Sequence, residues 1–550
     1  MRSAVSLLRR KIIASFIHGR KYHASALPSI ISPLSSDFQE KAKNMDELVN
    51  DLKTKLAQSR RGGSEKAQAK MKDSGKLLPR ERLSSLLDPS TPFLELSPLA
   101  AHNVYGSDDI PGAGIITGIG RISGRQCVVV VNDATVKGGS YYPLTVKKHL
   151  RAQEVARENG LPFESGGASL PNQANIEIIL GEYSTIWHAQ MSALGIPQIA
   201  VVHGISVAGG AYVPAMADEN IIVANQGRIF LAGPPLVRAA TGEQVDEETL
   251  GGGMMHSSES GVTDHLARDD EEAIAIAREC VGDLEHAGSM PAEAPYEPEE
   301  PVYSASDLHG IVGTDIRQAF DMREVIARVV DGSKFREFKP DYGTTIVTGF
   351  ARIHGFPVGI IGNNGILFSP SALKATHFIE LCSQRGIPLL FLVNVTGYMV
   401  GSKAERGGIA KDGAKMVRAV ACANVPKLTV IVGGSFGAGN YGMCGRAYQP
   451  RFLWMWPNAK VSVMGSGQLS QVMTSVSRDP TQHSALKQEI EEQSTAYYAT
   501  ARLWDDGIIL PTETRDTVGL GLAVSYPSLK SGRRGQSWEG ADRGMGVFRM

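Results

Sequence analysis

The chain carries one sequence pattern twice, and this duplication constrains its fold more than any other feature. Residues 116–124 read ITGIGRISG, and residues 347–355 read VTGFARIHG. Each copy continues into an apolar run, a glycine turn and a lysine-containing helical stretch, at 143–159 and at 370–385. Each stretch stops at Gly-Leu-Pro or Gly-Ile-Pro, a common helix ending. Because strands alternate with helices, we predict an α/β fold that is written twice.

An extended linker separates the two copies. Residues 290–303, MPAEAPYEPEEPVY, are rich in proline and glutamate and have little helical periodicity. A chain of 550 residues is also long for a single compact core. We therefore expect two domains, at about 40–290 and 304–550.

The N-terminus has the composition of a targeting segment. The first 36 residues contain no Asp or Glu, but they carry several Arg and Lys among Ser, Ala, Leu and Ile. Such a start is typical of a mitochondrial transit peptide, and the alternative is a plain basic tail. We expect a transit peptide within residues 1–35, cleavage soon after Tyr22, and a mature fold that begins near Ser36.

Composition argues against several other classes of protein. The formal net charge is -1, so no overall basic field favours nucleic acid. No stretch approaches the ~20 apolar residues of a membrane-spanning helix. The five cysteines form no CxxC pair, and the histidines have no HExxH spacing. We therefore expect no nucleic-acid partner, membrane span, disulfide framework or metal site.

Two glycine clusters lie where strands give way to helices. GISVAGGAY at 204–212 follows the strand-like QIAVV at 198–202, and GGSFGAGNYGM at 433–443 follows KLTVIV at 427–432. Backbone N–H groups at such turns can hold a developing oxyanion. The alternative is that both clusters are ordinary tight turns. Because each copy has one cluster, we predict two oxyanion holes that face each other.

Carboxyl transfer from N-carboxybiotin is a reaction that would need this pair. Negative charge develops on the biotin ureido oxygen and on the thioester carbonyl oxygen of the acceptor, and neither requires a side-chain nucleophile. No Ser-His-Asp set or phosphate-binding P-loop is visible in the sequence. The two clusters therefore favour this chemistry.

Long and specific strings accompany the clusters. From about residue 40 to the C-terminus, they make the chain resemble the acyl-CoA carboxyltransferase family of biotin-dependent carboxylases, most closely the branch that acts on methylcrotonyl-CoA. The strings include AGGAYVPAMADE at 208–219, FLAGPPLV at 230–237, NNGILFSPSALKATHFIELCSQRGIP at 363–388, GGIAKDGAKM at 407–416, GGSFGAGNYGMCGRAY at 433–448, FLWMWPNAKVSVMG at 452–465 and ARLWDDGI at 501–508.

The resemblance implies a fold, an activity and partners. The fold would be two tandem crotonase-like domains related by internal duplication. The activity would be transfer of carboxyl from carboxybiotin to 3-methylcrotonyl-CoA, giving 3-methylglutaconyl-CoA in leucine degradation. A biotin-containing α subunit would carry the biotin, so this chain would bind none covalently. The β chains would form a ring in an α6β6 complex of the mitochondrial matrix.

The resemblance also implies roles for individual residues. Gly209 and Gly210 would hold the acyl thioester oxygen, and Ala438 and Gly439 would hold the biotin oxygen. Phe436 and Gly437 would lie on the biotin side. The residues implied on the acyl-CoA side are Ser165, Gly166, Gly167 and Ala168 in the first copy and Gly362, Asn363, Asn364 and Gly365 in the second.

Residues 163–187 depart from the family pattern. Only Phe163 and Glu164 remain of the strand expected before Ser165, and IEIILGEYSTIW at 176–187 lacks similarity to the family. Codons chosen for this string, read from the third base, give Arg-Asp-His-Phe-Gly-Arg-Ile-Phe-Tyr-Asn, which matches the family motif. We interpret the segment as a shifted reading frame or a misplaced splice junction.

Two alternatives to the main interpretation follow. If the chain exists as written, the first copy loses a buried strand and a helix face, and the protein is a catalytically impaired ring scaffold. The second alternative is a sibling carboxylase for another acyl-CoA, such as geranyl-CoA, because the depth of the acyl pocket does not follow from the sequence.

Overall fold

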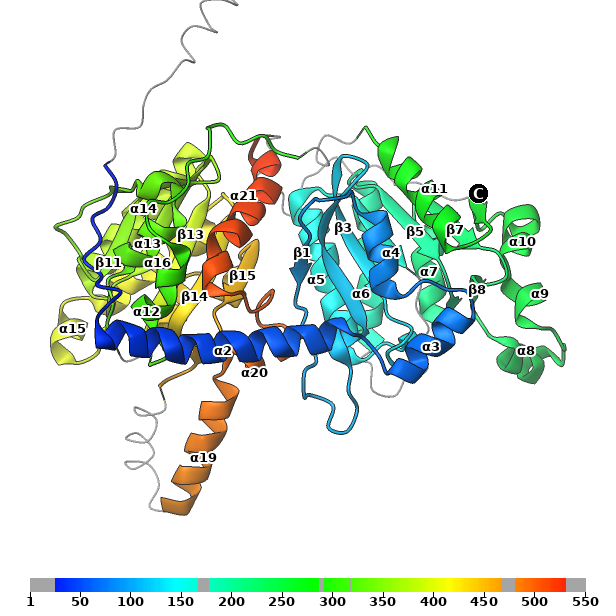
Figure 1. Ribbon diagram of the computed structural model, residues 1–550, viewed down its shortest axis with the longest axis horizontal. Coiled ribbons are helices and arrows are strands. Elements are labelled where there is room, and N and C mark those ends of the chain that lie inside the picture. Colours follow the sequence, from blue (N-terminus) through cyan, green and yellow to red (C-terminus); the bar gives the residue numbers. More distant parts are fainter. Residues whose placement is uncertain (1–24, 167–177, 286–290, 316–317, 466–479, 531–550) are drawn as a thin grey trace, which may run out of the picture.

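The computed structural model describes residues 25–166, 178–285, 291–315, 318–465 and 480–530. Two mixed sheets of seven strands lie in separate halves of the molecule, with helices packed around each. A long helix, α2 (Ser36–Arg60), runs along both halves (Figure 1). Residues 291–303, within the predicted linker, contain neither helix nor strand.

The first sheet has the order β1-β2-β3-β4-β5-β7-β9. Its first three strands are antiparallel, and the pairs from β3 to β9 are parallel. Two further strands, β6 (Ile205–Val207) and β8 (Arg228–Phe230), pair in parallel and form a separate two-stranded sheet. The strands of the main sheet are β1 (Leu94–Leu96), β2 (Ile115–Ile122), β3 (Arg125–Asn132), β4 (Phe163–Gly166), β5 (Gln198–Val202), β7 (Glu219–Val223) and β9 (His265–Ala267).

The second sheet repeats the first six strands of this order, and an isolated bridge between Met455 and Ile508 takes the place of β9. β10 to β15 are adjacent in sequence order, the first three strands are antiparallel, and β16 pairs with the end of β14 as β8 pairs with β6. This confirms the α/β fold written twice that the repeat predicts, and it agrees with the tandem crotonase-like domains that the resemblance implies. The strands are β10 (Arg336–Glu337), β11 (Ile346–Ile353), β12 (Phe356–Asn363), β13 (Leu389–Val395), β14 (Lys427–Phe436), β15 (Phe452–Met455) and β16 (Lys460–Ser462).

The two helices of the sequence repeat form as predicted. They are α5 (Pro143–Asn159) and α14 (Ser369–Arg385). Each ends at a glycine in the left-handed conformation, with φ of 64° at Gly160 and 66° at Gly386. A residue with a Cβ is strained at this φ, so the glycine of the Gly-Pro stop ends the helix.

Other helices cover the sheets or connect the strands, and none among the described residues is long and apolar enough to cross a bilayer. The longer helices are α3 (Glu65–Asp73), α4 (Pro79–Leu86), α6 (Ile178–Ala193), α8 (Pro234–Thr241) and α11 (Asp270–Gly282) in the first half, and α13 (Met322–Val329), α16 (Ile409–Cys422), α19 (Pro480–Gln493) and α21 (Thr514–Lys530) in the second.

The glycines of the TGIG and TGFA strings serve the same packing role in both sheets. A Cβ on Gly118 would lie 2.3 Å from Phe93 Cζ, and one on Gly349 would lie 2.4 Å from Phe335 Cζ. Each glycine therefore admits a phenylalanine ring over its strand, which a larger residue would exclude.

A buried lysine is also duplicated. Lys148 in α5 donates from Nζ to the carbonyl oxygen of Ile115, and Lys374 in α14 donates to that of Ile346, both at 2.8 Å. Each acceptor is the first residue of its strand. Each lysine therefore fixes its helix to the start of the corresponding strand.

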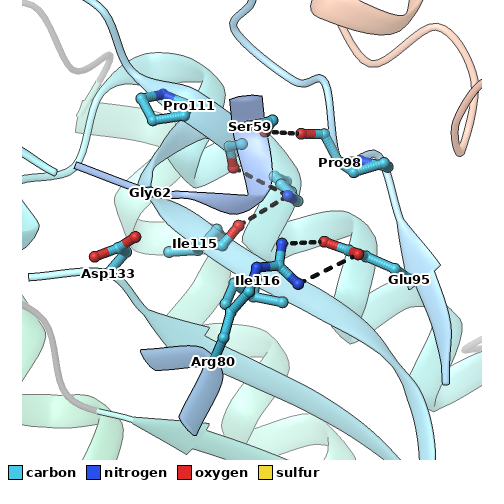
Figure 2. Close-up of a pocket in the computed structure, with 11 residues that line it drawn as sticks. Ser59, Gly62, Arg80, Glu95, Pro98, Pro111, Ile115, Ile116 and Asp133 are labelled. Atoms are coloured by element: carbon cyan, nitrogen blue, oxygen red, sulfur yellow. Dashed lines mark hydrogen bonds and ion pairs between the residues drawn. The ribbon is translucent and has the colours of Figure 1, made fainter. Parts of the chain in front are cut away.

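A paired carboxylate lies near each lysine. Figure 2 shows Arg80 beside Glu95, with Arg80 Nη2 2.7 Å from Glu95 Oε1. In the second sheet, Arg323 pairs with Glu337 at the same distance. Burial lowers the pKa of Lys148 to about 7, although Glu95 acts to raise it. The cavity of Figure 2 is therefore lined by Arg80, Glu95 and Lys148, the side chains that hold α5 and the strands of the first sheet in place.

The structure corrects the expectation that the first copy lacks its central strand. β4 has four residues against seven in β13, and it pairs in parallel with β3 and β5. Backbone bonds on both sides hold a strand that the side-chain pattern does not suggest. Residues 178–193 form a helix, α6, between β4 and β5, as α16 lies between β13 and β14 in the second domain.

The N-terminal part of the fold begins earlier than predicted. Ala26 pairs with Lys334, Leu27 N donates to Ser333 O, and Ser29 Oγ donates to Glu324. A chain that began at Ser36 would lose these contacts, whereas cleavage after Tyr22 would keep them. The rest of the predicted transit peptide, residues 1–24, lies outside the described residues.

Candidate active site

The glycine cluster of the first domain forms a turn between β6 and a short helix. β6 ends at Val207, which is extended at φ -125° and ψ 150°. Ala208 then takes a φ of 55°, and a 3₁₀ turn over Ala208–Ala211 leads into α7 (Tyr212–Met216). The turn therefore places Gly209 and Gly210 at the start of a helical segment, where N–H groups have no partner within the helix.

The second domain repeats this turn in its backbone angles. β14 ends at Phe436, at φ -121° and ψ 142°, and Gly437 follows at φ 54°. Gly437 is the first residue of α17 (Gly437–Gly442), and Ala438 and Gly439 are its second and third. Both glycine clusters thus share one backbone pattern: an extended residue, a left-handed residue and then two small residues at the start of a helical turn.

Gly439 is required by packing beneath the turn. A Cβ there would lie 2.8 Å from Val395 Cγ2 and 3.2 Å from Gly397 Cα, at the end of β13. Its φ is not left-handed. A larger residue at this position would push the turn away from β13, so it would displace the amides instead of merely filling the space before them.

The Gly362–Gly365 segment supports the second turn through side-chain bonds. Asn363 Oδ1 accepts from Asn394 N at 3.2 Å, and Asn394 Oδ1 accepts from Gly434 N at 3.0 Å. Asn364 Oδ1 accepts from Met322 N at 2.9 Å. This chain of bonds links the ends of β12, β13 and β14 just before Phe436.

These bonds show that the segment predicted to contact acyl-CoA, Gly362–Gly365, uses its asparagine side chains inside the protein. The amide oxygens of Asn363 and Asn364 are engaged inside the protein, and Gly362 leaves room for the Met322 side chain, which would lie 2.5 Å from a Cβ. Gly365, at φ 138°, allows the chain to leave the strand. The segment shapes the strand ends and offers mainly backbone to a ligand.

The remaining predicted residues follow β4. Ser165 pairs with Val130 and Ala200, and Gly166 pairs with Val201, so both occupy the middle of the first sheet. Gly167 and Ala168 lie outside the described residues. The structure therefore brings Ser165 and Gly166 to the end of a central strand.

A buried ion pair positions the first turn, and the sequence did not indicate it. His203, between β5 and β6, has Nδ1 2.8 Å from Asp270 Oδ1, and Arg82 Nη2 is 2.9 Å from Asp270 Oδ2. Burial acts to raise the pKa of Asp270, but His203 and Arg82 hold it below its ordinary range. Burial lowers the pKa of His203 despite the aspartate.

An exposed tyrosine follows each of the two turns at the same spacing. The motifs did not single out these tyrosines as site residues. Tyr212 follows Gly210 by two residues, as Tyr441 follows Gly439. Their exposed fractions are 46% and 52%, high for large aromatic side chains. Alignment of the two glycine clusters residue by residue was the signal that could have found them.

The chain matches the carboxyl transferase domain model over residues 70–531. It is 53% identical to a probable methylcrotonoyl-CoA carboxylase beta chain, mitochondrial, of Drosophila melanogaster, over 96% of both chains. It is 58% identical to a biotin-dependent 3-methylcrotonyl-coenzyme A carboxylase beta1 subunit of Mycobacterium tuberculosis, over 87% of this chain and 94% of that protein.

A solved structure also matches over nearly the whole chain. It is the beta subunit of geranyl-CoA carboxylase from P. aeruginosa, with a TM-score of 0.85, 40% sequence identity, and coverage of 96% of this chain and 100% of that one. The duplicated sheets, the matched turns and these similarities agree. The chain belongs to the carboxyl transferase domain family of biotin-dependent acyl-CoA carboxylase beta subunits.

Proposed function

We propose that this protein is the carboxyltransferase (β) subunit of a mitochondrial methylcrotonyl-CoA carboxylase. It would transfer carboxyl from carboxybiotin to 3-methylcrotonyl-CoA and release 3-methylglutaconyl-CoA. The observation that carries the proposal is the pair of turns with matching backbone angles at Gly209–Gly210 and Ala438–Gly439, in a chain 50–58% identical to relatives named for this reaction.

Each turn would stabilise one oxygen on which charge develops. The N–H groups of Gly209 and Gly210 would donate to the thioester oxygen as the acyl group becomes an enolate. Those of Ala438 and Gly439 would donate to the ureido oxygen of biotin, with Phe436 and Gly437 on the same side. Biotin, delivered by a partner subunit, would supply the activated carboxyl group.

The turns fit these ligands because their side chains are small. Gly437, Ala438 and Gly439 place no group larger than a methyl over their own amides, so a flat ureido ring can approach the backbone. The acyl-CoA side would use Ser165 and Gly166 at the end of β4, together with the Gly362–Gly365 segment. Gly167 and Ala168 belong to the same proposed site.

The proposed assembly is a ring of β chains with biotin-carrying α subunits in the mitochondrial matrix. Relatives from three eukaryotes are named mitochondrial, which supports the organelle. Large apolar side chains are exposed in both domains, and exposed apolar surface favours a protein partner. They include Tyr212, Leu231 and Leu236 in the first domain and Ile366, Phe368, Met399, Val400 and Tyr441 in the second.

The proposal is tested by reconstituting the chain with a biotin-carrying α subunit. We expect ATP- and bicarbonate-dependent carboxylation of 3-methylcrotonyl-CoA by the pair. We expect none by the chain alone, because its sequence has no AMKM biotin-attachment motif. Fixation of bicarbonate by the chain alone would contradict the partner requirement.

A second candidate substrate is geranyl-CoA. The solved structure that matches with a TM-score of 0.85 is named for that substrate, but at 40% identity it is less similar than the methylcrotonyl relatives. Comparison of kcat/KM for the two acyl-CoA substrates decides between them, and a higher value for geranyl-CoA would overturn the assignment.

The impaired-scaffold alternative is tested by the same assay and by the transcript. A folded ring with no turnover on either substrate would support a scaffold. Sequencing the transcript over codons 155–195 would test the reading-frame hypothesis, and an in-frame message for residues 176–187 as written would refute it.

A further inference from the structure

Three metal-binding side chains meet at the outer edge of the first sheet. Glu219 begins β7, His265 begins the edge strand β9, and Cys280 lies in α11, which packs over both strands. Glu219 Oε2 is 3.2 Å from His265 Nε2, and Cys280 Sγ is 3.9 Å from the same nitrogen. All three ligand atoms lie within 4.8 Å of one another.

These separations suit a tetrahedral transition-metal ion. Zinc bonds of ~2.0–2.3 Å to oxygen, nitrogen and sulfur, at tetrahedral angles, place neighbouring ligand atoms roughly 3.3–3.7 Å apart. The two measured separations lie close to this range, so small side-chain movements would complete the geometry. A thiolate and an imidazole favour zinc and its neighbours over magnesium or calcium.

The surroundings also suit an ion that enters from solvent. Cys280 is buried at 7% exposure, whereas the side chains of His265 and Glu219 are 39% and 43% exposed. The buried thiol would form the base of the site. The open side gives an entry path and leaves a fourth position for water.

The cluster is not part of the duplicated scaffold. Asp264 accepts a hydrogen bond from Asn220 N, as Asp506 accepts one from Leu453 N, which aligns β7 and β9 with their second-domain equivalents. In that alignment Phe452 replaces Glu219 and Gly507 replaces His265. The fold therefore does not need these polar groups at this edge.

We propose that Glu219, His265 and Cys280 form a binding site for a single zinc ion, with water as the fourth ligand. On binding, the Cys280 thiol becomes a thiolate and releases one proton to solvent. The ion ties the three-residue edge strand β9 to β7 and α11. The sequence did not predict this site because its ligands are far apart along the chain and form no spacing motif.

Cobalt substitution tests the site directly, since Co²⁺ takes the same ligands and reports a thiolate by a sulfur-to-metal charge-transfer band. The full-length chain is titrated with Co²⁺ and then with Zn²⁺. We expect one Co²⁺ per chain, a tetrahedral visible spectrum, the charge-transfer band, and loss of all three signals as zinc displaces cobalt.

Matched variants separate this site from adventitious binding. Cys280→Ser should remove the charge-transfer band, and Glu219→Gln should weaken binding by at least about tenfold, because even outer-shell partners contribute 10–100-fold. Cys422→Ser is the control, since Cys422 is the exposed cysteine. Circular dichroism confirms that each variant is folded.

Thermal unfolding provides a second readout. Zinc should raise the melting temperature of the parent chain and of Cys422→Ser but not that of folded Cys280→Ser. The proposal is overturned if the parent chain gives no charge-transfer band, or if the band is lost in Cys422→Ser and retained in Cys280→Ser.

Discussion

The two domains share a scaffold but differ where they meet each other. In both, a phenylalanine packs on a strand glycine, a buried lysine bonds the first strand carbonyl, and an arginine–glutamate pair lies near it. An aspartate in each accepts two N–H groups from the turn after the second strand, Asp88 in one and Asp331 in the other. Duplication therefore preserved the contacts inside each domain.

Asp264 and Asp506 occupy equivalent positions in the two domains, but their surroundings give them different roles. Both accept the backbone bond described above, but Asp264 is exposed and Asp506 is fully buried. Asp506 also binds Arg151 of the first domain, with Arg151 Nε 2.8 Å from Oδ1. One inherited carboxylate is thus a local strand contact, and the other joins the two domains.

The largest expected effect tests this contrast. Asp506→Ala removes the carboxylate that binds Arg151 at Nε and Nη2 and leaves this buried guanidinium only Glu154, 2.6 Å from Nη1, as an acidic partner among the described residues. Breaking this buried pair should cost about 3 kcal/mol of unfolding free energy. Asp264→Ala should cost less than about 1 kcal/mol, since its carboxylate is exposed. Denaturant unfolding of both variants measures the difference, and equal losses would show that burial at the junction is not what matters.

The next largest effect is on catalysis, where variants in the two glycine turns should change kcat and acyl-CoA affinity differently. Gly437→Val puts a β-branched residue at φ 54° and its Cβ about 3.0 Å from Val463 O, so the amides should shift. Loss of one oxyanion donor costs about 10²–10³ in turnover. We expect that loss in kcat, with acyl-CoA affinity nearly unchanged.

Ala208→Val is the matched variant in the first domain. Its turn is assigned to the thioester, so we expect weaker engagement of acyl-CoA as well as slower turnover. Steady-state kinetics on folded complexes distinguish the two patterns. If Gly437→Val turns over normally, the biotin side of the site is assigned to the wrong turn.

A smaller effect concerns pH. Burial raises the pKa of Asp505 to about 7, and Thr263 occupies the equivalent place in the first domain. Because the folded carboxyl binds its proton more tightly than the unfolded one, it favours folding at low pH. This contribution is lost as pH rises toward about 7.

Asp505→Asn should remove that dependence. Between about pH 5 and pH 8, the parent chain should lose about 1–3 kcal/mol relative to the variant, because each pH unit below the folded pKa costs about 1.4 kcal/mol of linkage free energy. Unfolding free energies at the two pH values test this. A difference between parent and variant that does not change with pH would contradict the raised pKa.

The smallest expected effect lies in the backbone of the turns. Ala208 and Gly437 share a left-handed φ, which costs a residue with a Cβ about 1–2 kcal/mol. Gly437→Ala should therefore destabilise by that amount. Ala208→Gly removes this strain, but glycine loses more conformational entropy on folding. The net stabilisation should therefore be less than about 1 kcal/mol. Melting temperatures of the pair check the opposite signs.

The sequence alone predicted the features whose signals are local. The repeat gave two sheets, the periodic stretches with Gly-Pro stops gave α5 and α14, and the glycine clusters gave the two turns. Each of these depends on residues close together in the chain, where propensity and turn chemistry act. The side-chain pattern failed at β4, because backbone pairing on both sides sustains that strand.

Only the tertiary structure decided which distant groups meet. Arg151 and Asp506 are 355 positions apart, and Glu219, His265 and Cys280 come from two strands and a helix. The engagement of Asn363 and Asn364 likewise depends on neighbouring strand ends. Such contacts follow from the register and packing of whole elements, which the spacing of residues along one chain does not encode.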